Sequence, residues 1–174
     1  MAAQPELRER APRLPPRIGA KKGLTLAAAE KAVTGPFEER LSAFLDLLYS
    51  DVRRAGVTGH AHAQVLFRWW LELSQTYDHE TGGAFAAYFS ALAAFYPAPG
   101  TLRFSPSEGE SFTRPQAERA MRAPFESLLK AYLKRLDDPM RSPGIKDDVH
   151  ARETFITFCR LVGRFEPHRT RGRK

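Results

Sequence analysis

The chain has 174 residues, with 27 Lys and Arg against 20 Asp and Glu, giving a formal net charge of +7. Its 43% hydrophobic content is typical of a globular domain with an apolar core, and a single cysteine excludes a disulfide scaffold. No run of 18 apolar residues occurs, so we predict no membrane span, no secretory signal in the polar, basic N-terminus, and a cytoplasmic location.

The positive charge is concentrated at the two ends of the chain. Residues 1–23 carry six basic and two acidic residues, a net of +4, and residues 160–174 carry six basic and one acidic, a net of +5. The total of +7 leaves −2 for residues 24–159. Basic ends on a nearly neutral body are typical of polyanion-binding arms, although such ends can also serve solubility alone.

The first third of the chain is predicted to hold a tail and two helices. Residues 1–23 are rich in proline, which removes backbone donors, so we expect an extended tail. Residues 24–33 form a short alanine-rich segment with helical propensity. Thr34-Gly35-Pro36 is predicted to break the chain, and a helix follows from Pro36 to Arg54.

The middle of the chain is predicted to hold two more helices. Residues 59–77 are apolar on several sides, which is typical of a central helix packed by its neighbours. Gly82-Gly83 breaks the chain, and an apolar stripe at helical spacing covers residues 85–96. We expect residues 97–113 to be a surface loop.

The last third is predicted to hold the final helices. Thr113 and Gln116 match a capping box at the start of a helix that Pro124 must either kink or restart. A loop then covers residues 139–146, and Asp147 or Asp148 caps the last helix.

The sequence therefore predicts an all-α, single-domain bundle of about six helices. The bundle would cover residues 24–166, between a basic N-terminal tail (1–23) and a basic C-terminal arm (167–174). We detect no internal repeat, and residues 1–58 give no indication of their role.

No catalytic motif with the spacing of a metalloprotease, nucleotide-binding loop or esterase is present, so we predict no enzyme and no cofactor. A metal-dependent enzyme is the weaker alternative, and its candidate ligands would be His60, His62, His79, Asp147, Asp148 and His150. Two histidines two residues apart cannot share a metal on a helix, because they point about 200° apart. Cys159 is predicted to be a buried apolar residue rather than a nucleophile.

The basic residues suggest sequence-independent binding to a phosphate backbone. If the last two helices are neighbours, Lys130, Lys134, Arg152 and Arg160 could form a ladder of cations leading into the C-terminal arm. An ordinary solvated face is the alternative. The candidate nucleic-acid-binding residues are Lys21, Lys22, Arg68, Lys130, Lys134, Arg135, Arg152, Arg160, Arg164, Arg169, Arg171, Arg173 and Lys174.

The C-terminal third also carries a resemblance. The segment Arg122-x-Pro124-Phe125, with Tyr132-Leu133-Lys134 after it, resembles the penultimate helix of the Csm-type small subunit of type III CRISPR effector complexes. Arg152-Glu153-x-Phe155-x-x-Phe158-Cys159-Arg160 resembles the start of that family's last helix, and the segment 64–70 resembles an earlier aromatic helix. The chain departs from the family pattern after Arg160.

The resemblance implies a non-catalytic antiviral-defence subunit that holds RNA by its phosphates within a ribonucleoprotein complex. Lys130, Lys134, Arg152 and Arg160 would then be its contact residues. The alternative is a protein-interaction module that exposes an aromatic patch and uses its tails for solubility. The aromatic residues considered for that patch are Trp69, Trp70, Phe89 and Tyr96. The sequence leaves open whether the nucleic acid is RNA or DNA, and which proteins are partners.

Overall fold

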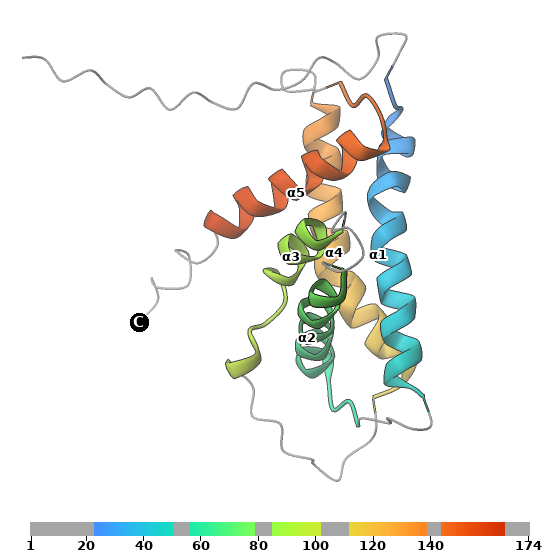
Figure 1. Ribbon diagram of the computed structural model, residues 1–174, viewed down its shortest axis with the longest axis vertical. Coiled ribbons are helices and arrows are strands. Elements are labelled where there is room, and N and C mark those ends of the chain that lie inside the picture. Colours follow the sequence, from blue (N-terminus) through green and yellow to red (C-terminus); the bar gives the residue numbers. More distant parts are fainter. Residues whose placement is uncertain (1–22, 51–55, 79–84, 102–111, 139–143, 166–174) are drawn as a thin grey trace, which may run out of the picture.

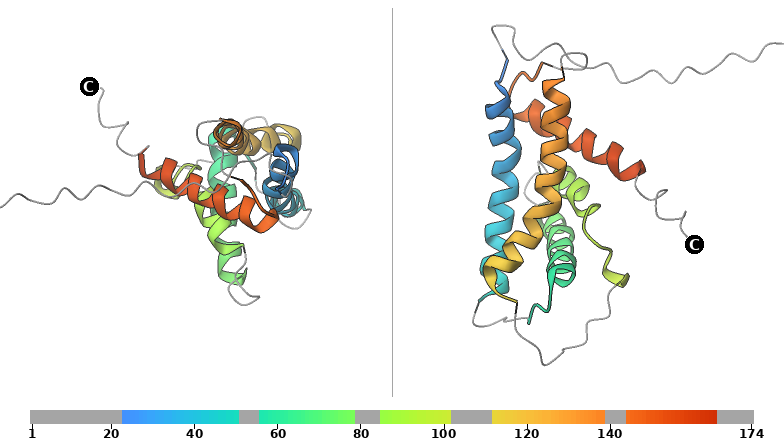
Figure 2. Two further views of the ribbon diagram at one scale, coloured as in Figure 1. Left: turned by 90° about the horizontal axis from the view of Figure 1, so that it is seen from above. Right: turned by 180° about the vertical axis from the view of Figure 1, so that it is seen from behind.

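The computed structural model describes residues 23–50, 56–78, 85–101, 112–138 and 144–165. The described elements are α1 (Leu26–Leu48), α2 (His60–Asp78), α3 (Ala86–Ala93), the 3₁₀ turn η1 (Pro99–Thr101), α4 (Arg114–Asp137) and α5 (Asp148–Phe165). Helices α1 and α4 run antiparallel along the long axis, and α5 crosses them obliquely near one end (Figures 1 and 2). The described residues contain no strand, which confirms the all-α prediction, with five α-helices rather than about six.

Helix α1 is continuous through Pro36, so the predicted break at Thr34-Gly35-Pro36 is wrong. Ala29 and Val33 before the proline and Phe37 after it are all fully buried on one face of the helix. Burial of that continuous face outweighs the preference of proline for a helix start. The helix also ends at Leu48, short of the predicted Arg54, and residues 51–55 lie outside the described part.

Helix α4 continues through Pro124, so the proline lies within one helix and does not start a new one. The predicted capping box at its start is confirmed, with the Thr113 N–H donating to Gln116 Oε1 at 2.9 Å. A proline leaves the carbonyl four residues earlier without its helical donor, which here is the carbonyl of Ala120. The Gln64 side chain of α2 donates to that carbonyl at 3.0 Å. The bend in α4 is thus compensated by a contact from α2.

The α1–α2 and α4–α5 pairs are two copies of one helical hairpin. Thr25 and Thr113, the N-caps of α1 and α4, lie 88 positions apart, and the same offset aligns the two hairpins without a gap. The identical pairs at this offset include Ala29/Ala117, Glu30/Glu118, Ala32/Ala120, Pro36/Pro124, Phe37/Phe125, Glu38/Glu126, Leu41/Leu129, Ala43/Ala131, Leu45/Leu133, Leu48/Leu136, Arg53/Arg141, Gly56/Gly144, His62/His150, Ala63/Ala151, Phe67/Phe155 and Leu73/Leu161. Our statement that the chain has no internal repeat is therefore wrong.

Contacts within each hairpin repeat as well. The Phe37 ring meets Phe67 with centroids 5.9 Å apart, and the equivalent pair, Phe125 and Phe155, has centroids 5.8 Å apart. Both arrangements are edge-on, and all four rings are buried. The repeat is therefore structural, since the same side chains pack in the same way in both copies.

Contacts between the hairpins are reciprocal. The Leu24 N–H donates to the carbonyl of Ile145, and the Phe112 N–H donates to the carbonyl of Val57, both at 2.8 Å. Each donor precedes the first helix of one hairpin, and each acceptor lies between the two helices of the other hairpin. The offset of 88 converts one bond into the other. The two halves are therefore related by an approximate two-fold axis.

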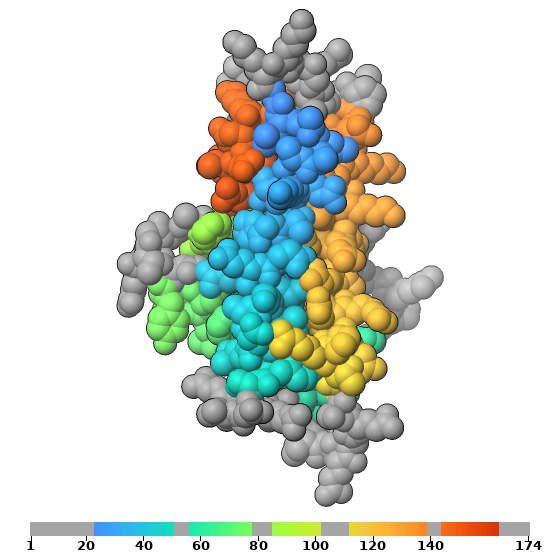
Figure 3. Space-filling view, turned by 90° about the vertical axis from the view of Figure 1, so that its right-hand side faces the viewer, coloured from blue at the N-terminus to red at the C-terminus, as the bar shows by residue number. Residues whose placement is uncertain are grey.

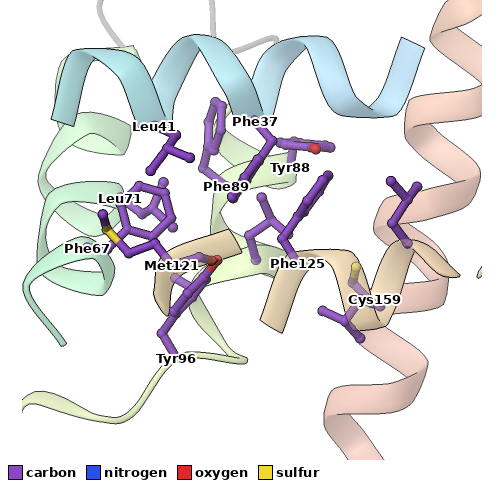
Figure 4. Close-up of a cluster of buried hydrophobic side chains, with 14 of the residues drawn as sticks. Phe37, Leu41, Phe67, Leu71, Tyr88, Phe89, Tyr96, Met121, Phe125 and Cys159 are labelled. Atoms are coloured by element: carbon purple, nitrogen blue, oxygen red, sulfur yellow. The ribbon is translucent and has the colours of Figure 1, made fainter. Parts of the chain in front are cut away.

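The axis passes through the contact between α1 and α4. Phe37 and Phe125, which are equivalent residues, stack on each other with centroids 3.8 Å apart and planes within 1° of parallel. Figure 4 shows this part of the core, with Phe37 below α1 and Cys159 at the α5 side. The stack joins the centres of the two halves, directly after the proline in each helix.

Helix α3 lies across both halves. The Tyr88 hydroxyl donates to the carbonyl of Val33 at 2.7 Å, and the Tyr96 hydroxyl donates to the carbonyl of Met121 at 2.8 Å. Val33 and Met121 are equivalent positions, each three residues before a proline. The two tyrosines are 1% and 2% exposed, and burial raises the pKa of both hydroxyls far above its usual value. Both therefore stay protonated and donate across the physiological range.

We expect Phe37→Ala and Phe125→Ala to lower the free energy of unfolding by similar amounts, roughly 3–5 kcal/mol each. Each change removes one ring of the central stack and leaves a cavity between α1 and α4. Urea unfolding followed by circular dichroism measures the effect. Tyr77→Ala is the matched control, because it removes an aromatic ring that is 73% exposed and should cost less than about 0.5 kcal/mol. A loss at Phe37 no larger than the loss at Tyr77 would contradict the assignment of the stack as the centre of the core.

Candidate nucleic-acid interface

The outer face of α4 presents two unpaired lysines. Lys130 and Lys134 are exposed and one helical turn apart, and neither forms a salt bridge with any described residue. Glu126, one turn before Lys130, is exposed too, but the two side chains do not pair. An unpaired lysine pair on a rigid helix can contact successive phosphates without reading bases. In Figure 3 the long α4 side chains (orange) project to the right of α1.

The predicted ladder from α4 to α5 is not assembled on one surface. Helix α5 packs on the side of α4 that carries Tyr132, whose hydroxyl donates to the carbonyl of Ala151 at 3.1 Å. Lys130 and Lys134 each lie two residues from Tyr132, which places them about 200° around the helix. They therefore point away from α5, and Figure 3 shows α5 (red-orange) on the opposite side of α1.

The candidate arginines of α5 lie in separate surroundings. Arg152 is half-buried, with its guanidinium over the Phe85 ring at 5.8 Å and its Nε donating to the carbonyl of Asp148 at 3.2 Å. Arg160 is exposed, two turns further along the helix. Arg152 thus helps to hold the start of α3 against α5. Of these two arginines, Arg160 is the one that is exposed and forms no salt bridge with a described residue.

Two further candidates, Arg68 and Arg135, also differ in whether the guanidinium is bonded within the fold or exposed. Arg68 donates from its guanidinium to the carbonyl of Tyr96 at 2.7 Å and from Nε to Glu72 at 2.9 Å. These bonds tie the end of α3 to α2, so we leave Arg68 out of the interface. Arg135 is exposed, but it lies about 100° around α4 from Lys134.

The other candidates lie outside the described part of the structure. They are Lys21, Lys22, Arg169, Arg171, Arg173 and Lys174, together with the side chain of Arg164. Their positions in the sequence place them in the two basic ends, so they remain predictions.

The internal repeat shows which cations the fold does not need. Lys130 and Lys134 correspond to Ser42 and Asp46 of the first hairpin, which folds in the same way with those residues. Asp46 is moreover paired with Arg114, at 2.6 Å between oxygen and nitrogen. The unpaired cations of α4 are thus an addition to the second hairpin rather than a requirement of the hairpin fold.

The sequence analysis did not identify Arg122 as the ion-pair centre that joins α1 to α4. Its guanidinium makes two hydrogen bonds to Glu38 of α1 and also bonds to Glu118, one turn earlier in α4. The bond to Glu38 raises the pKa of Arg122 above its usual value. The Glu118 and Arg122 spacing is visible in the sequence, but the pairing with Glu38 depends on how α1 packs against α4.

Two of the candidate metal ligands, His62 and His150, form hydrogen bonds that stabilise the turns before their helices. The His62 Nδ1 accepts from the Thr58 N–H at 3.1 Å, and the His150 Nδ1 accepts from the Lys146 N–H at 3.1 Å. The two bonds are equivalent under the repeat and close the turn before α2 and before α5. Among the described residues, no three His, Cys, Asp or Glu side chains lie close enough to hold one metal ion, and His79 lies outside them.

Cys159 is buried among the apolar residues of the core, as the sequence predicts. Burial raises the pKa of its thiol to about 12. A thiol with this pKa stays protonated at neutral pH, so its chemistry is that of a small apolar side chain.

One face of α2 exposes large apolar side chains. Leu73 is 62% exposed and Tyr77 is 73% exposed, and Trp70 beside them is half-buried. Of the four aromatic residues predicted to form an exposed patch, Phe89 and Tyr96 are instead core residues, 1% and 2% exposed. Among the described residues, Leu73 and Tyr77 of α2 thus form this apolar face, and Val149 of α5 is a further exposed apolar residue.

None of the described helices combines the length and the apolar content needed to cross a bilayer. Comparisons with protein-family models, curated proteins and solved structures give no match for this chain. The resemblance to the Csm-type small subunit thus stays a prediction. Three residues that carry it, Phe125, Phe155 and Cys159, are core residues, so packing accounts for them.

We expect the stability of the fold to decrease with acidity through His62. Burial lowers the pKa of His62 below its unfolded value of about 6.5, and its Nδ1 can accept from Thr58 only while that nitrogen is unprotonated. The unfolded chain then binds the proton more readily than the folded one. The contribution of His62 to the free energy of unfolding is therefore fully present above about pH 6.5, and it is lost as the pH falls through the folded-state pKa. Urea unfolding between about pH 7.5 and about pH 5 measures this loss.

His62→Asn is the control for this measurement, because its side-chain oxygen can accept the same bond and does not titrate. Its unfolding free energy should fall less between the two pH values than that of the wild type. The same pH dependence in both proteins would contradict the role of His62.

Proposed function

We propose that the protein binds nucleic acid through the phosphate backbone, without reading bases and without catalysing a reaction. The observation that carries the proposal is the exposed pair Lys130 and Lys134 on the outer face of α4, neither of which forms a salt bridge with a described residue. The first hairpin has Ser42 and Asp46 in these places, so the fold alone does not account for the lysines.

The charge of the whole chain supports this proposal. The net charge is +7, and the two ends carry net charges of +4 and +5 by sequence. Cations in flexible or exposed positions bind a polyanion by releasing its counterions, so affinity depends on salt concentration rather than on base sequence. RNA within a larger ribonucleoprotein complex is the ligand that the resemblance to the CRISPR small subunit favours.

We expect the Lys130→Ser, Lys134→Ser double variant to bind a single-stranded oligonucleotide more weakly and equally so for unrelated sequences. Removing two phosphate contacts should reduce the slope of log affinity against log salt concentration by about 1.4. Fluorescence anisotropy titrations at several salt concentrations, with oligonucleotides of RNA and of DNA, measure both quantities.

The matched control removes the same charge elsewhere, with Lys31→Ser in α1 and Lys146→Ser before α5, both exposed and neither a candidate binding residue. Its salt slope should change less. An equal change would contradict the assignment to α4, and binding of the wild type that is absent or independent of salt would contradict the proposed function.

The second candidate function is protein interaction through the exposed apolar face of α2. The specific observation is again a difference between the repeats, since Leu66 and Trp69 of α2 correspond to Thr154 and Thr157 of α5. Both threonines bond back to carbonyls of their own helix, at 2.6 and 3.0 Å. The hairpin thus folds with polar residues in these places. In α2, Leu66 and Trp69 are half-buried, Leu66 packs against the core, and both extend the apolar face that ends in the exposed Leu73 and Tyr77.

If this surface is accessible, Leu73→Ser together with Tyr77→Ser should reduce the fluorescence of an apolar-surface dye such as bis-ANS. The free energy of unfolding should change by less than about 0.5 kcal/mol, because both side chains are exposed. Unchanged dye binding would contradict the surface, and a large loss of stability would show that α2 needs these residues for folding.

A further inference from the structure

The surface that joins the two hairpins is built from equivalent residues on both sides. Phe37 of the first half meets Phe125 of the second, its own equivalent, and the reciprocal bonds from Leu24 and Phe112 close the two ends. A surface of this kind is isologous, as in a two-fold dimer of separate chains. The molecule is in this sense a dimer of hairpins fused into one chain.

Each hairpin therefore needs the other hairpin to complete its core, but that hairpin can come from the same chain or from a second copy. The contacts that the first hairpin makes with its own second hairpin are available, with the same atoms, from the second hairpin of another copy. We infer that the α1–α4 surface accepts the matching hairpin of a second copy, so that two chains can exchange halves and form a dimer. The inference does not depend on the proposed function.

Residues 79–111 connect the two halves, and this connection determines which form prevails. Within this connection, Tyr88 of α3 and Tyr96 bond to both halves of the same chain, and the covalent link raises the effective concentration of one half near the other, so a single chain closes on itself in dilute solution. Exchange becomes competitive at high protein concentration, or when closure within one chain is made unfavourable.

The ion pair between Glu38 and Arg122 makes the exchange testable. This ion pair joins α1 to α4 close to the two-fold axis, with both oxygens of Glu38 bonded to the guanidinium. The two side chains are 40% and 29% exposed, so a change of charge there does not bury an uncompensated ion.

The experiment uses two full-length variants, Glu38→Arg and Arg122→Glu. Closure within either chain places like charges together, and so does exchange between two copies of the same variant. When the two different variants exchange halves, position 38 of each chain meets position 122 of the other chain, and both of these pairs have opposite charges. We expect the two variants, unfolded together in urea and refolded as a mixture, to give a dimer that contains one chain of each kind. Size-exclusion chromatography with light scattering and native mass spectrometry identify it.

The control is the double variant Glu38→Arg, Arg122→Glu in one chain, which restores the pair internally and should refold as a monomer. The expected result is a mixed dimer from the two single variants that neither gives when refolded alone. If the mixture yields only monomers or unfolded chains while the double variant folds, the inference is overturned. This outcome is independent of nucleic-acid binding, which the monomeric double variant can be tested for separately.

Discussion

The antiparallel contact between α1 and α4 is the constraint around which the molecule is arranged. Each helix contains a proline followed by a phenylalanine, and the two phenylalanine rings stack with centroids 3.8 Å apart. Because the rings are equivalent residues, the stack fixes the approximate two-fold axis. The second helix of each hairpin and the central helix α3 then occupy positions that follow from this axis.

The duplication separates what the fold requires from what the surface adds. Positions that agree between the halves, such as Phe67 and Phe155, are core positions with equivalent contacts. Exposed positions that differ mark the candidate nucleic-acid surface, where Lys130 and Lys134 replace Ser42 and Asp46. On the apolar face of α2, the positions that differ are the half-buried Leu66 and Trp69. The chain thus supplies its own comparison, with one half serving as the reference for the other.

The sequence predicts the local features of this structure well. Helical spacing of apolar residues identifies α2, α4 and α5, and the capping box at Thr113 identifies where α4 starts, because these signals act within one or two helical turns. The predicted break at Pro36 is wrong because Phe37 is buried against the other hairpin. This is a long-range contact, and local helix propensity does not predict it.

The arrangement of the candidate interface was less accessible from the sequence. The cation ladder assumed that α4 and α5 present their basic residues to one side, and this depends on the crossing of two helices rather than on spacing. Arg68 and Arg152 are occupied by Tyr96 and Phe85, which lie at the two ends of α3. The repeat relates positions 88 residues apart, and the local spacing of apolar residues does not reveal a relation over that distance. Some equivalent core positions are also similar rather than identical, as with Val33 and Met121.

The hydroxyls of Tyr88 and Tyr96 have a consequence for how the molecule opens. They attach α3 and the turn that follows it to the backbone of both α1 and α4, so neither hairpin can loosen without withdrawing a buried donor from its acceptor. A chain of two similar units could in principle melt one unit at a time, as repeat proteins do. Here α3, which carries Tyr88, and the turn after it, which carries Tyr96, couple the units. Backbone amides in both halves should therefore exchange with solvent through one common opening event.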